Sequence, residues 1–167
     1  MNFELTAASW LVDNLDLIPK GARVLDVAAG KGRNARFLAA AGWVVHAVDR
    51  DAAALAALDG VVTTAVVDLE LETPTLGRRE YGAVLVFNYL HRPLMPAIVD
   101  AVAPGGVLIY ETFTVGQSAR GHPRNPAFLL HEGELPALVA PLDVVRFREG
   151  EFDGNLVASI VAARARA

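Results

Sequence analysis

Short apolar runs alternate with helix-like segments along most of the chain. The runs have the length of strands and lie at residues 23–28, 43–48, 61–67, 83–87 and 107–110. Three of the segments between them are predicted helices, at 33–41, 51–58 and 94–102. Continuous apolar strands separated by helices are typical of a parallel sheet that is covered on both faces. The pattern therefore predicts an α/β fold, a three-layer Rossmann-like sandwich.

The two ends of the chain depart from this alternation. Apolar residues recur at helical intervals over residues 3–17, until Pro19 and Gly21 interrupt the pattern, so we expect a leading helix within residues 1–20. Near the other end, after a short predicted helix at 132–139, apolar stretches at 142–148 and 156–163 flank a turn-rich segment typical of a hairpin. The completed sheet has seven strands and is mostly parallel, with an antiparallel last strand.

Residues 113–130 form the longest segment without a regular pattern, and several glycines, prolines and charged residues interrupt it. Loops of this length inside a compact domain usually carry function or move. Because this loop follows the fifth strand, we expect it on the substrate side of the sheet. The sequence shows no repeat and no second domain, so residues 1–167 are interpreted as a single domain.

The composition narrows the possible chemistry. With 53% hydrophobic and 20% charged residues, the chain falls in the ordinary globular range. It has no cysteine, which excludes disulfides, thiolate metal sites and a cysteine nucleophile, and we predict no metal site. The formal net charge of −4 is opposite to what a broad phosphate-binding face requires, so no nucleic-acid partner is expected.

The first ten residues, MNFELTAASW, contain an early acid and no basic stretch before a long apolar run, unlike a secretory signal. No run of 18 apolar residues is present, so a membrane span is not expected. We therefore predict a cytoplasmic protein, a monomer or a homodimer.

A glycine-bearing turn, Ala28-Ala29-Gly30-Lys31-Gly32, joins the first strand to the first helix of the alternating pattern. Glycines at such a junction let a ligand approach the backbone, beside helix N–H groups that have no other partner. A nucleotide-like ligand is therefore predicted. The segment 30–35 also fits the G-x-G-x-x-A turn of dinucleotide-binding folds, and Asp49 ends the next strand, so an NAD(P)-binding oxidoreductase has to be considered.

Asp26 argues against a dinucleotide. It lies four residues before Gly30, so its carboxylate would face the same cleft, where it would repel a pyrophosphate and attract a cationic group. In addition, 167 residues leave little room for a substrate domain, and a closing antiparallel strand is atypical of the dinucleotide fold.

At these residues the chain resembles the class I S-adenosylmethionine (SAM)-dependent methyltransferases, and the resemblance covers nearly the whole sequence. The pattern of that superfamily is an acid followed by three glycines at alternate positions, matched here by Asp26, Ala28, Gly30 and Gly32. Alanine replaces the first glycine, and its methyl group is tolerable if the backbone at Ala28 has a negative φ. The resemblance implies SAM as the cofactor.

Further cofactor contacts follow from the same resemblance. Asp49, followed by Arg50, matches the acid that accepts hydrogen bonds from both ribose hydroxyls, and Asp68 with Leu69 matches the pair beside the adenine. An alternative is that Asp49 and Asp68 only cap the helices that follow them. The remaining predicted contacts are to the methionine part of SAM, and they are Arg33 and Asn34 in the first helical turn and Asn88 and Tyr89 after the fourth strand.

Within the superfamily, the motif style is closest to the small tellurite- and thiopurine-type methyltransferases, which act on small nucleophiles. After the fourth strand, His91, with an unperturbed pKa of about 6.5, could accept a proton, and Arg92 could hold an oxyanion. Arg120, His122 and Arg124 in the long loop would favour a small anionic acceptor. A polar turn and a solvated loop are the alternatives for these two groups.

The sequence thus predicts in-line transfer of a methyl group from SAM to a small acceptor molecule, a reaction that depends mainly on orientation. Two alternatives stay open at this point. They are the oxidoreductase considered above and a SAM-binding protein without catalytic activity.

Overall fold

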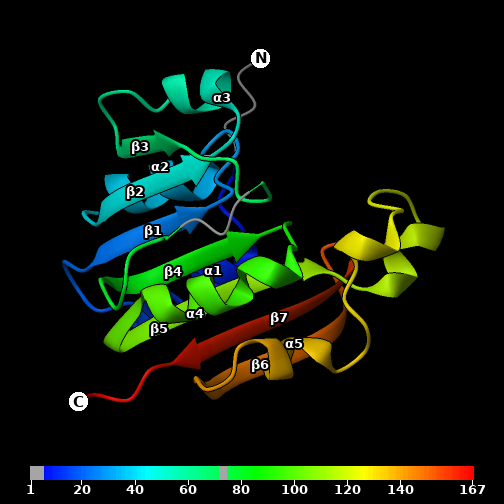
Figure 1. The fold of residues 1–167 in the computed structure, drawn as a ribbon. Helices are drawn as coiled ribbons and strands as arrows, with labels where there is room; N and C mark the ends of the chain where they lie inside the picture. Colours follow the sequence, from blue (N-terminus) through cyan, green and yellow to red (C-terminus); the bar gives the residue numbers. More distant parts are fainter. Residues whose placement is uncertain (1–5, 72–74) are drawn as a thin grey trace.

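The computed structural model describes residues 6–71 and 75–167, and these form one seven-stranded sheet flanked by helices (Figure 1). The strand order is β3-β2-β1-β4-β5-β7-β6. The strands are β1 (Arg23–Val27), β2 (Val44–Asp49), β3 (Thr63–Val66), β4 (Tyr81–Phe87), β5 (Val102–Phe113), β6 (Asp143–Phe152) and β7 (Asn155–Ala163). The first five strands pair in parallel, whereas β7 is antiparallel to both β5 and β6. The predicted sheet is confirmed, including its antiparallel last strand.

Helices cover both faces of the sheet and make the predicted three layers (Figure 1). One face carries α1 (Ser9–Asp13), α2 (Arg33–Ala40) and α3 (Ala52–Ala56), whose buried residues share an apolar cluster that includes Leu11, Leu38 and Leu55. The other face carries α4 (Met95–Ala101) and α5 (Glu134–Leu138), which pack through a second cluster that includes Ile98 and Leu135. Residues of the two clusters alternate along the strands, because successive side chains of a strand point to opposite faces of the sheet.

The leading helix is shorter than predicted. It consists of α1 and a single 3₁₀ turn, η1 (Leu15–Leu17), while Phe3 and Leu5 lie outside the described residues. Asn14 explains the break, because its side-chain amide donates to the Trp10 carbonyl (2.7 Å), the acceptor that its own backbone N–H would use in a continuing helix. The Asn14 N–H bonds to Leu11 instead (3.1 Å).

The last two strands are longer than predicted, and only Asp153 and Gly154 remain between them. Both residues have positive φ angles, 52° and 80°, as two-residue hairpin loops require. Strand β5 is also longer than its apolar run, since it begins at Val102 and continues through Pro104-Gly105-Gly106.

The loop at 113–130 folds into a small lobe beyond the carboxyl ends of the parallel strands (Figure 1). It contains two 3₁₀ turns, η3 (Val115–Ala119) and η4 (Pro126–Phe128). The backbone N–H of Val115 donates to the Leu130 carbonyl (2.9 Å) and that of Leu130 to the Phe113 carbonyl (2.9 Å), which closes the base of the lobe. Buried Gln117 bonds to Asn155 (3.0 Å) and Leu156 (2.8 Å) at the start of β7. The lobe is therefore fixed to the sheet rather than loosely attached.

No helix among the described residues has both the length and the apolarity needed to cross a bilayer.

A buried hydrogen bond fastens the N-terminal segment to α2. The backbone N–H of Ala8 donates to Oδ1 of Asn34 (2.9 Å), and both residues are buried. This bond occupies the side-chain oxygen of Asn34, a residue that the sequence assigned to the cofactor.

We expect Asn34→Ala to lower the free energy of unfolding by about 1–3 kcal/mol, because it leaves the buried Ala8 N–H without an acceptor. Urea denaturation measures the loss. Asn125→Ala is a matched control, since it also removes a side-chain acceptor from a backbone N–H, that of Ala127, but at an exposed position where water can replace it. Equal losses in the two variants would contradict this account.

Candidate functional site

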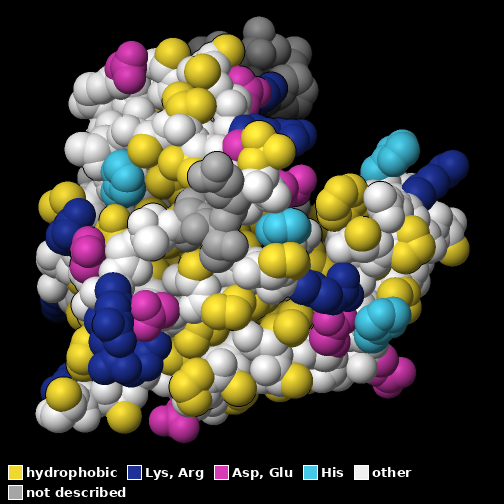
Figure 2. Space-filling model, viewed as in Figure 1, with side chains coloured by type: hydrophobic (Ala, Val, Ile, Leu, Met, Phe, Trp, Pro, Cys, Tyr) yellow, Lys and Arg dark blue, Asp and Glu magenta, His cyan; other side chains and the backbone are white. Residues whose placement is uncertain are grey.

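Two adjoining cavities lie at the carboxyl ends of β1 to β5, where ligands of open α/β sheets bind. The larger has a volume of about 810 Å³ and reaches from the ends of β2 and β3 to the lobe, and the smaller, of about 260 Å³, surrounds the glycine turn. Ala28 and Asn88 line both cavities and thereby join them. Figure 2 shows the surface hollowed between the body of the sheet and the lobe.

The glycine turn leaves its backbone open toward the smaller cavity. Gly30 has a φ of 56°, and a Cβ built on it would meet nothing within 4 Å. Gly32, with a φ of 77°, is tightly packed instead, because a Cβ there would lie 2.5 Å from the side chain of Leu58. Gly32 is thus required for packing against the segment after α3, whereas Gly30 provides free space for a ligand.

Asp26 lines the smaller cavity from the end of β1. Its side chain is buried, and Oδ2 has no hydrogen-bond partner among the described residues. Burial, followed by the charge of Asp49, raises the pKa of Asp26 to about 7, although Arg33 and the Ala35 amide act in the opposite direction. A buried carboxylate is stable as an anion only when a partner compensates its lost hydration, so this site fits the cationic group of a ligand.

Ala28 departs from the expectation for the first glycine position. Its φ is 54°, so the condition of a negative φ is not met. Asn88, the other residue shared by the two cavities, is also left-handed, with a φ of 56°. Asparagine tolerates this region better than alanine, for which it costs about 1–2 kcal/mol. Backbone strain is thus concentrated where the cavities join.

Asp49 connects the end of β2 to the glycine turn. Its Oδ2 accepts the Gly30 N–H (2.8 Å) and its Oδ1 accepts the Asp51 N–H (2.8 Å), while the side chain lines the larger cavity. A carboxylate has about four lone-pair sites, so further hydrogen bonds can be accepted. The helix-capping alternative is wrong for Asp49, because Asp51 caps α3 by accepting the Ala54 N–H (3.0 Å).

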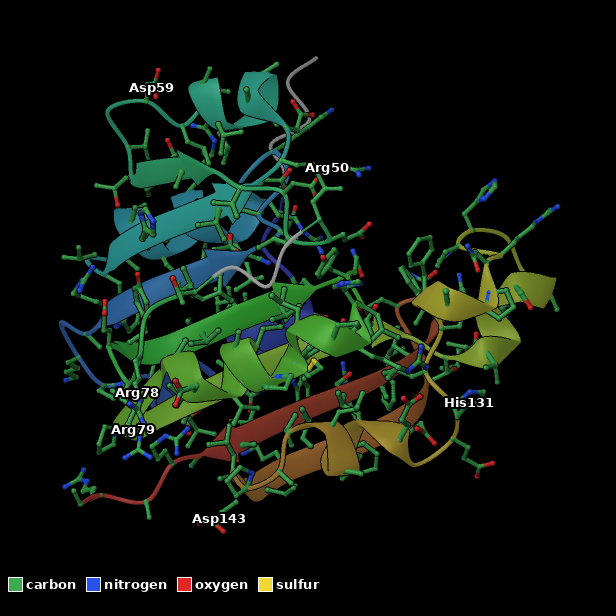
Figure 3. The ribbon with its side chains drawn as sticks, in the orientation of Figure 1. Arg50, Asp59, Arg78, Arg79, His131 and Asp143 are labelled. Atoms are coloured by element: carbon green, nitrogen blue, oxygen red, sulfur yellow. The ribbon has the colours of Figure 1, made fainter. Side chains whose placement is uncertain are left out.

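The residues after β3 form the neighbouring wall. Asp68 accepts the Glu70 N–H (3.0 Å), Leu69 is buried, and all three residues line the larger cavity. Arg50 joins this wall from β2, and Figure 3 shows it on the side of the sheet that faces the lobe, whereas Arg78 and Arg79 lie at the opposite edge. The predicted residues Asp49, Asp68 and Leu69 are therefore brought together.

Tyr89 lies closer to these acids than the sequence suggested. It lines only the larger of the two cavities, and its hydroxyl is buried without a hydrogen-bond partner among the described residues. Burial raises the pKa of Tyr89 to about 12, and the charges of Glu70 and Asp68 add to this. The hydroxyl is thus a neutral donor that faces the acidic wall, not the glycine turn.

Arg92 does not serve as an oxyanion group. Its guanidinium donates to both carboxylate oxygens of Glu134 (2.6 and 2.8 Å) and to the carbonyls of Ala127 (3.2 Å) and Leu129 (2.9 Å). It lines neither of the two cavities, and neither does half-buried His91, the predicted proton acceptor. Arg92 instead holds the base of the lobe to α5.

The predicted cluster of cations in the lobe is only partly formed. His122 and Arg124 line the larger cavity, whereas Arg120 lies outside both cavities and pairs with Glu151 (2.9 Å) on the surface. The apolar part of this wall, which was not predicted from the sequence, consists of Leu90, Phe113, Pro123 and Phe128. No motif marks these residues, although Phe113 and Phe128 are the two phenylalanines of the segment 113–130.

Solved structures of methyltransferases have the same fold. The chain is 22% identical to TehB from Haemophilus influenzae, with a TM-score of 0.72 over 92% of the chain, but it spans only 61% of the length of that protein. A TehB-like SAM-dependent methyltransferase from Corynebacterium glutamicum is 18% identical, with a TM-score of 0.69 over 92% of this chain and 85% of that one. A SAM-dependent methyltransferase from Mesorhizobium loti is 15% identical, with a TM-score of 0.74 over 96% of this chain and 100% of that one.

No functionally curated protein matches the sequence. A family model, however, covers most of it, because that of the tellurite resistance protein TehB matches residues 2–149. The matched segment contains strands β1 to β5 and the acids Asp26, Asp49 and Asp68. The chain therefore belongs to the tellurite resistance protein TehB family.

Proposed function

We propose that the protein is a SAM-dependent methyltransferase that acts on a small acceptor molecule. The observation that carries the proposal is the buried carboxylate of Asp26, whose Oδ2 has no hydrogen-bond partner among the described residues, beside a glycine turn whose backbone is open at Gly30. The α-amino group of SAM is a cation of the kind that this carboxylate lacks. Membership of the TehB family and the names of the solved relatives support the same activity.

The two cavities divide the cofactor between them in this proposal. Asp26 would hold the amino group in the smaller cavity, with Arg33 and Lys31 at its wall for the carboxylate. Asn34 contributes to the wall, but its Oδ1 is already bonded to Ala8. In the larger cavity Asp49 would accept from the ribose hydroxyls and Asp68 from the adenine amino group.

The cofactor, when bound, supplies a methyl group on a positively charged sulfur. The protein's own task is to orient the acceptor in line with that group and to exclude water, and orientation of this kind can contribute about 7–11 kcal/mol. No residue of the chain has to become covalently attached. Asn88 and Ala28, which lie where the cavities meet, are the residues we place beside the reacting atoms.

The two other candidate functions are less well supported. A dinucleotide would place its pyrophosphate against Asp26, and the antiparallel pairing of β5 with β7 departs from the parallel dinucleotide fold. A SAM-binding protein without catalysis would have the same cofactor cavities. A turnover assay that follows release of S-adenosylhomocysteine separates it from an enzyme. The cytoplasmic location, the monomeric or homodimeric state and the lack of a nucleic-acid partner stay predictions from the sequence.

Asp49→Ala is expected to weaken SAM binding about 10- to 150-fold, because it removes a charged acceptor worth about 1.5–3 kcal/mol. Isothermal titration calorimetry measures the change. Asp51→Ala is the matched control, since Asp51 lies two residues away, caps α3 and lines neither cavity. Unchanged affinity in Asp49→Ala would refute the ribose assignment.

SAM affinity is expected to rise roughly tenfold between pH 5.5 and pH 7. The pKa of Asp26 is about 7, so the carboxyl group is mostly protonated at the lower pH, and the amino group of SAM stays charged throughout. Asp26→Asn should bind SAM weakly and without this slope. If the affinity of Asp26→Asn for SAM still rises with pH, the pH dependence belongs to another group.

The free energy of unfolding of the ligand-free protein should fall over the pH range in which the affinity for SAM rises. Because the folded-state pKa of Asp26 is raised, the native state binds more protons than the unfolded chain, and stability falls as the pH rises from about 4 to about 7. Asp26→Asn removes this loss, so denaturation at pH 8 should find the variant more stable than the wild type.

Ala28→Gly is expected to raise the free energy of unfolding by up to about 1 kcal/mol, because glycine adopts the left-handed conformation without the strain that alanine has there. It should also strengthen SAM binding a few-fold, because it removes a methyl group from a residue that lines both cavities. Thermal unfolding and calorimetry measure the two effects. The control is Ala29→Gly, at a neighbouring position without a positive φ, which should destabilise the protein by about 0.5–1 kcal/mol. Equal effects of the two substitutions would show that strain at Ala28 is not the cause.

A further inference from the structure

We infer that the methyl acceptor is an uncharged, largely apolar molecule that binds against Phe113 and Phe128, rather than a small oxyanion. The inference rests on the proposed methyltransferase function and concerns the part of the larger cavity that faces the lobe.

The position of this subsite follows from the way the cavities join. The sulfur of SAM connects its methionine and ribose parts, so the transferred group belongs near Ala28 and Asn88, which line both cavities. The N–H of Asn88 donates to the carbonyl of Glu111 (2.9 Å), which fixes the end of β4 beside the end of β5. Thr112 and Phe113 follow Glu111 directly, and both line the larger cavity. An acceptor that reaches the methyl group must therefore contact this strand end.

The wall at this place is mostly apolar. Leu90 and Thr112 are almost completely buried, and Phe113 and Pro123 complete the surface toward the lobe. Phe128 also lines the cavity, yet 41% of its surface is exposed. A flat apolar ligand would cover this ring and remove its surface from water, which is the main source of affinity in small-molecule sites.

The charges of the cavity do not favour an anion. Arg92 and Arg120, two of the expected anion-binding groups, are neutralised by Glu134 and Glu151 and lie outside the cavity. The lobe side of the larger cavity keeps one guanidinium group, that of Arg124, together with His122, while the acids of the lining, Asp49, Asp68 and Glu70, lie at the cofactor end. An oxyanion would therefore meet one arginine instead of the three that the sequence suggested, Arg92, Arg120 and Arg124, whereas an uncharged acceptor does not depend on a cation.

The reaction balances without a further reactant. A lone pair of the acceptor forms the bond to the methyl carbon, the carbon–sulfur bond of the cofactor breaks with its electrons left on sulfur, and any proton on the acceptor leaves to water at the mouth of the cavity. A thiol suits this arrangement, because its pKa of about 8.5 makes no strong base necessary.

The test compares phenylmethanethiol with tellurite as acceptors, following release of S-adenosylhomocysteine, while calorimetry with S-adenosylhomocysteine reports the cofactor site independently. We expect saturable turnover of the thiol, a KM for it at least tenfold higher in Phe128→Ala, and little change in Arg124→Ala. Phe147→Ala is the matched control, because Phe147 is also 41% exposed but lies on β6 and lines neither cavity. Phe147→Ala should leave the KM unchanged. The affinity for S-adenosylhomocysteine should be unchanged in all three variants.

Preferential turnover of tellurite, with a KM that rises in Arg124→Ala and not in Phe128→Ala, would overturn the inference and leave the methyltransferase intact. Turnover of neither acceptor by a protein that still binds S-adenosylhomocysteine would also overturn it. Failure to bind S-adenosylhomocysteine at all would refute the proposed function instead, so the two failures are distinguishable.

Discussion

The carboxylate of Asp26 is buried near the end of β1, and the arrangement of the site depends on how it is held there. Strand β1 lies between β2 and β4, with Asp26 in register with Ala47 and Leu85, so neither neighbour offers a side-chain donor. Apolar clusters on both faces exclude water from this part of the sheet. A buried carboxylate with one oxygen left without a partner is unfavourable, and the native state bears that cost because the sheet around it is well packed. The same burial makes the group selective for a cation.

The backbone around Asp26 is set before any ligand arrives. Asp49 holds the glycine turn through Gly30, and Gly32 is fixed against Leu58. Ala28 and Asn88 keep left-handed conformations at the junction of the two cavities. Unfavourable backbone conformations persist only where the surrounding structure imposes them, and here they lie where we place the reacting atoms. A rigid turn of this kind would lose little conformational freedom on binding.

The lobe gives the larger cavity its second wall, and structural interactions decide which of its side chains face inward. Arg92 fastens the base of the lobe to Glu134, and Gln117 fastens its start to the β6–β7 hairpin. Arg120 is bound on the outside by Glu151. Cations that would otherwise suggest an anion site are therefore parts of the scaffold. The surface left facing the cavity is largely apolar, which changes the class of acceptor that the wall fits.

The sequence by itself determined the architecture and the acids at the strand ends. Strands and helices follow from the spacing of apolar residues within short windows, and acids that end parallel strands must meet at one edge of the sheet, so both could be predicted locally. The tertiary structure decided the φ of Ala28, because alanine by itself favours a negative φ and only the surrounding fold imposes the positive one. It also decided the roles of Arg92 and Arg120, whose carboxylate partners lie 42 and 31 residues away, a separation that no local pattern encodes. Which side chains line the cavity depends on such long-range pairings, and for that physical reason the apolar wall became apparent only in the folded protein.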